Sequence, residues 1–182
     1  MKLLRYLLFP IMPIYFVVTW LRNQLYDYGL KKSKTYHFPV LCVGNLSAGG
    51  TGKTPMVEYL IRLLKSDFKI ATLSRGYGRE TDGFVLGSAK ANAKSLGDEP
   101  FQFYSKFSKD IMVAVDANRQ QGIAKLRELL LKPEAIILDD AFQHRKVTAG
   151  LNILLTTYSN LYYKDFVLPT GDLREPRAGA KR

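Results

Sequence analysis

The sequence predicts an α/β fold in which a mostly parallel sheet is flanked by helices. Short apolar runs rich in β-branched residues alternate with helical patterns from residue 40 to residue 156. This alternation is typical of strand–helix–strand units, whose right-handed crossovers place helices on both faces of a sheet. A glycine-rich turn follows the first apolar run, and an aspartate pair follows a later one. Both features fall at predicted carboxyl ends of strands, the edge where open α/β sheets bind ligands.

Each element is predicted from its own pattern. Strands are expected at residues 40–43, 70–73, 111–115, 135–138 and 152–156, and those at 70–73 and 135–138 are expected to be buried. The helix after the glycine-rich turn has apolar residues at helical spacing, namely Val57, Leu60, Ile61 and Leu64. Residues 101–107 form an aromatic helical stretch. A last helix is expected at residues 119–131, with Ile123, Leu126 and Leu130 on one face and Pro133 ending it.

The N-terminal residues differ from the rest, because residues 6–21 carry no charge. This run is shorter than the roughly 20 apolar residues of a membrane span, and Pro10 and Pro13 would kink or break a helix. No small-x-small site follows it, which argues against a cleavable signal peptide. Basic flanks and Trp20 suit a headgroup interface, while a core helix packed on the domain is the alternative. We expect residues 1–34 to form a membrane-associated segment that carries a helix.

Composition sets limits on the class of protein. The 182 residues suffice for one domain with a sizeable core, and 47% of them are hydrophobic, which excludes wholesale disorder. A single cysteine, Cys42, excludes an internal disulfide, and with only two histidines it excludes a Cys/His zinc cluster. The formal charge of +11 favours anionic partners, namely nucleic acid, acidic lipid or phosphorylated substrates. The basic residues are scattered, without the arginine-rich arm of a nucleic-acid binder.

The glycine-rich turn has the layout of a phosphate-binding P-loop. Glycines let backbone N–H groups approach an anion, and the N-terminus of the following helix adds donors and a partial positive charge. Lys53 would reach the β- and γ-phosphates, and the Thr54 hydroxyl would hold Mg²⁺. Ser47 stands where the pattern G-x-x-x-x-G-K-[ST] has its first glycine. We predict nucleoside triphosphate binding by Ser47, Ala48, Gly49, Gly50, Thr51, Gly52, Lys53 and Thr54.

Two further loops carry polar residues after predicted strands. Residues 74–79 contain Arg75 and Arg79, whose planar guanidinium groups suit phosphate recognition, although an ordinary solvated turn fits equally well. Asp98 and Glu99 precede the aromatic helix, where they form either a helix cap with a first-turn acid or a catalytic base with a metal ligand. The spacing alone leaves the two alternatives for the arginines open, and for Asp98 and Glu99 it favours the helix cap with a first-turn acid.

The predicted strand at residues 135–138 ends in Asp139 and Asp140. An apolar strand that delivers aspartates to its carboxyl end is what a Walker B element needs, because a carboxylate there can hold Mg²⁺ opposite the P-loop threonine. The following His144 would either order the site or be a plain loop histidine.

With these motifs in place, the chain resembles the tetraacyldisaccharide 4'-kinases, membrane-associated P-loop kinases of lipid A biosynthesis. The matching stretches are GNLSAGGTGKTP (44–55), SRGYGR (74–79), GDEP (97–100), DDAFQH (139–144) and LPTGDLREP (168–176). They occur in the family's order and cover the chain from Val40 onward. The family's P-loop accepts serine at Ser47, and Ala141 stands where the family usually has glycine. Such kinases exceed 300 residues, so we expect a fragment without the C-terminal part, which in the family supplies a histidine that partners the catalytic aspartate.

The resemblance implies a P-loop kinase domain at residues 35–182. It would transfer the γ-phosphate of ATP, with Mg²⁺, to the 4'-hydroxyl of tetraacyldisaccharide 1-phosphate. Asp98 becomes the candidate base for the sugar hydroxyl, and Lys53, Asp139 and His144 are further catalytic candidates. Arg75 and Arg79 are expected to contact anionic groups of the cofactor. The candidate metal ligands are Thr54, Glu99, Asp140 and Glu175.

The resemblance also implies the partners. A substrate with four acyl chains stays in the bilayer, so we expect the enzyme at the cytoplasmic face of the bacterial inner membrane. Nucleic acid and an obligatory protein partner are not expected. The rival function is a MinD- or ParA-like regulatory ATPase, whose P-loop begins with a signature lysine. Ala48 occupies that position, which argues against the rival.

Overall fold

The computed structural model describes residues 5–182, and residues 1–4 of the predicted membrane segment lie outside the described residues. The chain forms two compact units. Unit 1 contains residues 1–33, 45–52 and 154–182, and unit 2 contains residues 34–44 and 53–153.

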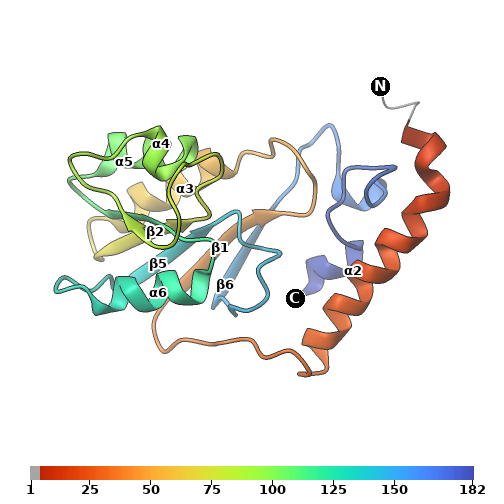
Figure 1. The fold of residues 1–182 in the computed structure, drawn as a ribbon, viewed down its shortest axis with the longest axis horizontal. Coiled ribbons are helices and arrows are strands. Elements are labelled where there is room, and N and C mark those ends of the chain that lie inside the picture. Colours follow the sequence, from red (N-terminus) through yellow and green to blue (C-terminus); the bar gives the residue numbers. More distant parts are fainter. Residues whose placement is uncertain (1–4) are drawn as a thin grey trace. The chain divides into compact units, whose positions relative to one another are not determined.

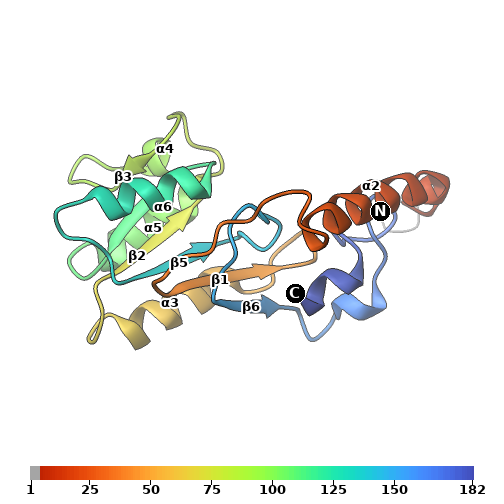
Figure 2. The same ribbon diagram turned by 90° about the horizontal axis from the view of Figure 1, so that it is seen from below.

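The sheet has six strands in the order β3-β4-β2-β5-β1-β6. The strands are β1 (Val40–Asn45), β2 (Ile70–Ser74), β3 (Val85–Leu86), β4 (Met112–Val115), β5 (Ala135–Asp139) and β6 (Leu151–Leu155). The pairs β1–β5, β2–β5 and β2–β4 are parallel, whereas the two-residue strand β3 is antiparallel to β4. Figure 2 shows β2, β5 and β1 side by side. The mostly parallel sheet is therefore confirmed.

Helices cover both faces of the sheet in unit 2. They are α3 (Lys53–Leu64), α4 (Ala93–Leu96), α5 (Asp98–Phe107) and α6 (Arg119–Glu128). Helix α6 lies on the opposite side of the strands from α3 and α5 (Figure 1). Because β2 and β5 are covered on both sides, every residue of these two strands is buried. Their carboxyl ends, at Ser74 and Asp139, bring polar side chains to one edge of the sheet.

The predicted helix at residues 119–131 is shorter in the structure. Ile123 and Leu126 are buried as expected, but α6 ends at Glu128 and Leu130 is 99% exposed. Leu129 has an extended backbone, which ends the helix well before Pro133. The sequence analysis also missed β3 and the one-turn helix α4, which are too short to show a period.

Unit 1 contains the N-terminal helices η1 (Tyr6–Ile11) and α2 (Met12–Asp27), followed late in the chain by η2 (Tyr162–Lys164) and η3 (Arg177–Lys181). Pro10 lies in the 3-10 segment and Pro13 in the first turn of α2, so neither proline interrupts the α-helix. Within the described part of the chain, no helix has the length and apolar character needed to cross a membrane.

The N-terminal helices expose apolar side chains over most of their surface. The exposed residues include Leu7, Ile11, Ile14, Val17, Val18, Trp20 and Leu21. Asn23 is the buried residue of α2, and its amide donates to a carboxylate oxygen of Glu175 at 2.8 Å. The Tyr15 hydroxyl donates to the carbonyl of Arg174 at 2.8 Å. Polar contacts thus join helix α2 to the rest of unit 1, while many of its apolar residues are exposed to solvent.

Candidate functional site

The carboxylate pair at the end of β5 forms the centre of the candidate site in unit 2. Asp139 stands in register with Val43 of β1, the strand that leads into the glycine-rich loop. Its side chain is 2% exposed and accepts a hydrogen bond from the Ser74 hydroxyl at 3.1 Å. Ser74 is the last residue of β2, the other parallel neighbour of β5. Two adjacent strands therefore converge on one buried carboxylate.

Burial raises the pKa of Asp139 to about 7, and the nearby carboxylates of Glu99 and Asp140 raise it further. The Ser74 hydrogen bond and the Lys53 ammonium act in the opposite direction without cancelling the effect of burial on the pKa. A buried acid surrounded by other acids is an arrangement that a bound cation would stabilise.

Asp140 has an unusual backbone conformation. Its φ is 45°, the one positive φ found at a non-glycine among residues 5–182. Aspartate and asparagine tolerate this left-handed region better than other side chains do. Its carboxylate lies 3.6 Å from the ammonium group of Lys53, which opens α3. The turn at Asp140 thus directs the carboxylate toward the start of the P-loop helix.

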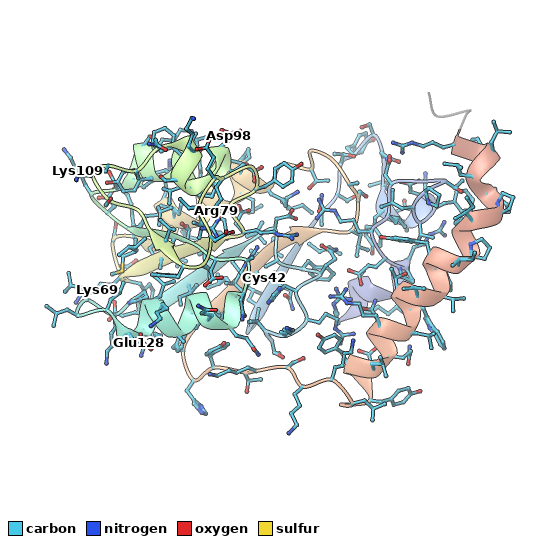
Figure 3. The ribbon with its side chains drawn as sticks, viewed as in Figure 1. Cys42, Lys69, Arg79, Asp98, Lys109 and Glu128 are labelled. Carbon is cyan, nitrogen blue, oxygen red and sulfur yellow. The ribbon has the colours of Figure 1, made fainter. Side chains whose placement is uncertain are left out.

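Asp98 and Glu99 occupy the first turn of α5, and both are exposed. The N-cap is Gly97 with φ 90°, so the two acids are first-turn residues rather than caps. A Cβ at Gly97 would lie 2.7 Å from the carbonyl oxygen of Tyr77. The loop at residues 74–79 therefore packs directly against the start of α5. Figure 3 shows Asp98 and Arg79 toward one end of unit 2, with Lys69 and Lys109 toward the other.

The two predicted phosphate-binding arginines differ. Arg79 donates to the carbonyl of Gly83 at 2.7 Å and to the Thr81 hydroxyl at 3.4 Å, so its guanidinium braces its own loop. Arg75 is exposed at the carboxyl end of β2. His144 is half-buried in the turn after β5, where its amide donates to the carbonyl of Ala141 at 2.8 Å.

The sequence analysis missed Arg119, the first residue of α6. Its side chain is 2% exposed and donates to the carbonyls of Asp116 at 2.8 Å and Asp139 at 3.4 Å. Burial lowers the pKa of Arg119 to about 10, although Asp139 opposes the shift. A cation in the first turn of a helix is disfavoured by the helix dipole. A positive charge at the start of a helix, four residues after the end of β4, was the signal in the sequence that could have identified Arg119.

The glycine-rich loop belongs to unit 1 and is braced from its base. The Asn45 amide donates to the Thr51 hydroxyl at 2.8 Å and to the carbonyl of Gly49 at 3.4 Å. Gly49 and Gly52 have φ of 118° and 84°, conformations that favour glycine. The loop continues without a break into Lys53 and Thr54 of α3.

The LPTGDLREP segment supports the same loop within unit 1. Ser47 is buried and forms a bridge with Leu173, and the Ala48 amide donates to the carbonyl of Asp172 at 2.6 Å. The Arg174 amide donates to the carbonyl of Leu46 at 2.7 Å. This segment therefore acts as a short strand that fixes the beginning of the loop.

Glu175, a predicted metal ligand, lies in unit 1 and is 2% exposed. Arg182 donates to both of its carboxylate oxygens, at 2.8 and 2.5 Å, and Asn23 donates to one of them. A metal ion at Glu175 would have to replace at least one of these donors.

The donors around Asp139 suit a hard cation. Hydroxyl and carboxylate oxygens, such as those of Thr54, Glu99 and Asp140, are the ligands that Mg²⁺ prefers. No group of three or more Asp, Glu, His or Cys residues that could hold a metal occurs within residues 5–182. Mg²⁺ in phosphoryl-transfer sites needs only one or two carboxylates, because substrate phosphates and water complete its shell. The residues present therefore fit Mg²⁺ bound together with a nucleotide.

Comparison with known proteins identifies the family. A family model described as tetraacyldisaccharide-1-P 4'-kinase matches residues 4–182. The chain belongs to this family. A crystal structure of LpxK from Aquifex aeolicus in complex with ATP resembles the chain with a TM-score of 0.90 at 41% identity. The match covers 98% of this chain and 56% of that one. The predicted P-loop kinase fold is thereby confirmed.

Curated relatives agree with this assignment. The tetraacyldisaccharide 4'-kinase of Flavobacterium johnsoniae is 59% identical over 182 residues, which is 100% of this chain and 53% of the relative. The enzyme of the same name from Bacteroides fragilis is 53% identical over 176 residues, or 96% of this chain and 46% of the relative. The chain thus spans about half the length of the curated relatives it matches.

Proposed function

We propose that the chain forms the nucleotide-binding part of an ATP-dependent kinase that phosphorylates the 4'-position of tetraacyldisaccharide 1-phosphate. The main support for this proposal is an ion pair between the start of α3 and the end of β5. The ammonium nitrogen of Lys53 lies 3.6 Å from a carboxylate oxygen of Asp140. A P-loop lysine and a strand-end aspartate in this arrangement are the common parts of phosphoryl-transfer sites. Family membership adds the identity of the acceptor lipid.

In this proposal the glycine-rich loop and Lys53 bind the phosphates of ATP. Backbone N–H groups of the loop and of the first turn of α3 provide donors, and the ammonium of Lys53 leaves Asp140 to contact the transferred phosphoryl group. Because the Lys53 side chain is 10% exposed, its interaction with an anion would be screened little by solvent. Arg75 is exposed, whereas the guanidinium of Arg79 already donates to the carbonyl of Gly83, so Arg75 is the better candidate for an additional anion contact.

Asp98 is proposed as the base that accepts the proton of the sugar hydroxyl. Its side chain is exposed in the first turn of α5 and therefore accessible to an acceptor arriving from solvent or membrane. Proton acceptance by one positioned carboxylate is the main covalent task that this reaction leaves to the protein. Asp139 and His144 would help to order the site. Asp139 would do so as the buried acceptor of the Ser74 hydrogen bond.

Mg²⁺ would be held by the Thr54 hydroxyl with carboxylates drawn from Glu99 and Asp140. When bound, it would neutralise charge on the β- and γ-phosphates. Asp140 and Glu99 already lie close enough to Asp139 to raise its pKa, so a cation at this point would relieve repulsion among three acids.

The exposed apolar residues of η1 and α2 support attachment to a membrane surface. Ile14 and Val18 are 65% and 60% exposed at i and i+4 of α2, so they share one face. A patch of this kind on a helix is typical of proteins that insert shallowly into a bilayer. We propose that this segment places the site beside a lipid substrate, at the cytoplasmic face of the inner membrane.

The test is phosphate transfer to the lipid by the chain and two lysine variants. Lys53→Met should reduce transfer by about 100-fold or more, because a preorganised charge at the transferred group is removed. Lys69→Met is the matched control, since Lys69 lies outside the site, immediately before β2 (Figure 3). Equal activity of the Lys53→Met variant and the unsubstituted chain would refute the proposed role of the P-loop.

A further inference from the structure

The P-loop helix α3 carries a buried acid that neither the fold nor the proposed chemistry explains. Glu58 is only 7% exposed, and it lies on α3 between the core residues Val57 and Ile61. Burying a carboxylate is unfavourable unless hydrogen bonds and opposite charges compensate for lost hydration. The carboxylate of Glu58 therefore needs partners that compensate for its burial.

The partners of Glu58 come mainly from a different helix. On α5, Lys106 donates to Oε1 at 2.5 Å and Gln102 donates to the same oxygen at 3.0 Å. On its own helix, Arg62 donates to Oε2 at 3.0 Å. Burial raises the pKa of Glu58, but the hydrogen bonds from these three side chains outweigh it and lower the pKa overall. The carboxylate is therefore ionised at neutral pH and joins α3 to α5.

Further contacts also join α3 and α5, or the residues that directly follow them. The guanidinium of Arg62 lies 5.0 Å from the ring centroid of Phe107, near the end of α5. Lys65 and Asp110, just beyond the two helices, form an ion pair at 2.6 Å. Glu58 is the buried member of this series, since the side chains of Lys65 and Asp110 are 32% and 40% exposed. Buried charged contacts resist displacement more than exposed ones do.

The two helices that Glu58 joins both begin at the candidate site. Helix α3 begins with Lys53 and Thr54, and α5 begins with Asp98 and Glu99. With a rise of about 1.5 Å per residue, Glu58 lies roughly 7 Å along α3 from Lys53, and Gln102 lies roughly 6 Å along α5 from Asp98. The contact between Glu58 and Gln102 therefore lies within about two turns of the first residue of each helix.

We propose that Glu58 is a positioning residue that clamps the helix carrying Asp98 against the helix carrying Lys53. Its consequence for catalysis rests on the proposed function, while the clamp itself does not. Misplacement of a catalytic group by about 1 Å can reduce a rate by about 100-fold. Loss of the clamp would therefore lower the rate of transfer without removing any group that touches ATP.

The first test is kinetic. Glu58→Gln keeps the size of the side chain but removes its charge, and we expect kcat to fall about 10- to 100-fold while KM for ATP stays within about twofold. In an Asp98→Asn background the same substitution should have almost no further effect, because the group that it positions has already been lost. Additive losses in the double variant would overturn the proposal. Glu128→Gln is the matched control, since Glu128 forms an exposed helical ion pair with Lys125.

The second test needs no activity. Hydrogen–deuterium exchange of residues 98–107 should accelerate in Glu58→Gln while exchange in α6 stays unchanged, and unchanged exchange in α5 would overturn the clamp. Lys106→Met removes the α5 partner instead of the buried acid, so it serves if Glu58→Gln folds poorly. Faster exchange in α5, with no transfer by the unsubstituted chain, would remove the proposed function and leave the clamp in place.

Discussion

Asp140 and Lys53 lie 3.6 Å apart and join the end of β5 to the first residue of α3. The side chain of Lys53 is 10% exposed, whereas that of Asp140 is 33% exposed. The ion pair therefore has a buried lysine and an aspartate that solvent can reach. An ion pair with one accessible member is readily exchanged for contacts with a bound anion and cation, and this exchange is the basis of the predictions about the site.

Asp140 combines a left-handed backbone with a charged side chain, and two substitutions separate these properties. Asp140→Asn should keep the stability of the chain, because asparagine tolerates φ of 45°, whereas Asp140→Ala should lower the free energy of unfolding by about 1 kcal/mol. Both should reduce Mg²⁺-dependent nucleotide binding. Denaturant unfolding and nucleotide titration measure the two effects. Equal stability of the two variants would contradict the assigned strain.

The raised pKa of Asp139 predicts a pH dependence of stability. Its folded pKa of about 7 exceeds the ordinary value of 3.8, so the folded state binds more protons than the unfolded state between these values. The contribution to stability is full below about pH 4 and is lost as pH rises to 7. The loss is at most about 4 kcal/mol, since each pKa unit corresponds to about 1.4 kcal/mol.

Asp139→Asn tests that pH dependence, because the amide oxygen can still accept the Ser74 hydrogen bond and cannot titrate. In metal-free buffer, the variant should be more stable than the unsubstituted chain at pH 8, and the difference should shrink at pH 5. Unfolding by denaturant at both pH values gives the comparison. Parallel stability profiles for the two proteins would show that the pKa of Asp139 is the same in the folded and unfolded states, which would contradict this prediction.

Gly44 allows β1 to pack against the turn after β5. A Cβ there would lie 2.5 Å from the Cβ of Phe142 and 3.1 Å from its backbone nitrogen. Gly44→Ala should therefore destabilise the chain by about 1–3 kcal/mol, as overpacked cores do. Gly150→Ala is the control, because the nearest atom to its Cβ would be 3.7 Å away. Thermal or denaturant unfolding of both variants measures the difference in stability, and equal unfolding midpoints would contradict the packing argument.

Membrane attachment through α2 predicts a clear loss of vesicle binding. Ile14→Ser combined with Val18→Ser should weaken binding to anionic phospholipid vesicles by at least about tenfold, since burial of each such side chain contributes about 1.5–3 kcal/mol. Leu130→Ser alters an apolar residue of unit 2 that is 99% exposed, and it should leave binding unchanged. Co-sedimentation with vesicles gives both values. Unchanged binding by the α2 variant would place the attachment elsewhere.

The sequence predicted the parts of the fold that depend on local pattern. Strands β1 and β5 are marked by apolar runs, and the loop at residues 47–54 is marked by its glycines. These signals can be recognised without knowledge of a distant partner. Strand β3 could not be predicted, because its two residues are defined only by pairing with β4. Leu130 was wrongly placed on a helix face, because the pattern does not show where the backbone becomes extended.

The candidate site shows the same division. Asp139 and Asp140 could be identified because Asp139 ends a buried apolar strand and Asp140 directly follows it. Glu58 could not, since its partners Gln102 and Lys106 are 44 and 48 residues away and belong to another helix. Sequence proximity identifies groups delivered by one strand, whereas contacts between helices depend on packing that only the structure provides.

The most direct test of the central claim is to follow the γ-phosphate of ATP when lipid is present. We would incubate the 182-residue chain with γ-labelled ATP and tetraacyldisaccharide 1-phosphate in mixed micelles, beside the longer relative from Flavobacterium johnsoniae. We expect label in the lipid from both proteins and little label from the Asp98→Asn variant of the 182-residue chain. Label released only as inorganic phosphate by the chain, while the relative labels the lipid, would contradict the claim that these residues direct phosphate to the lipid.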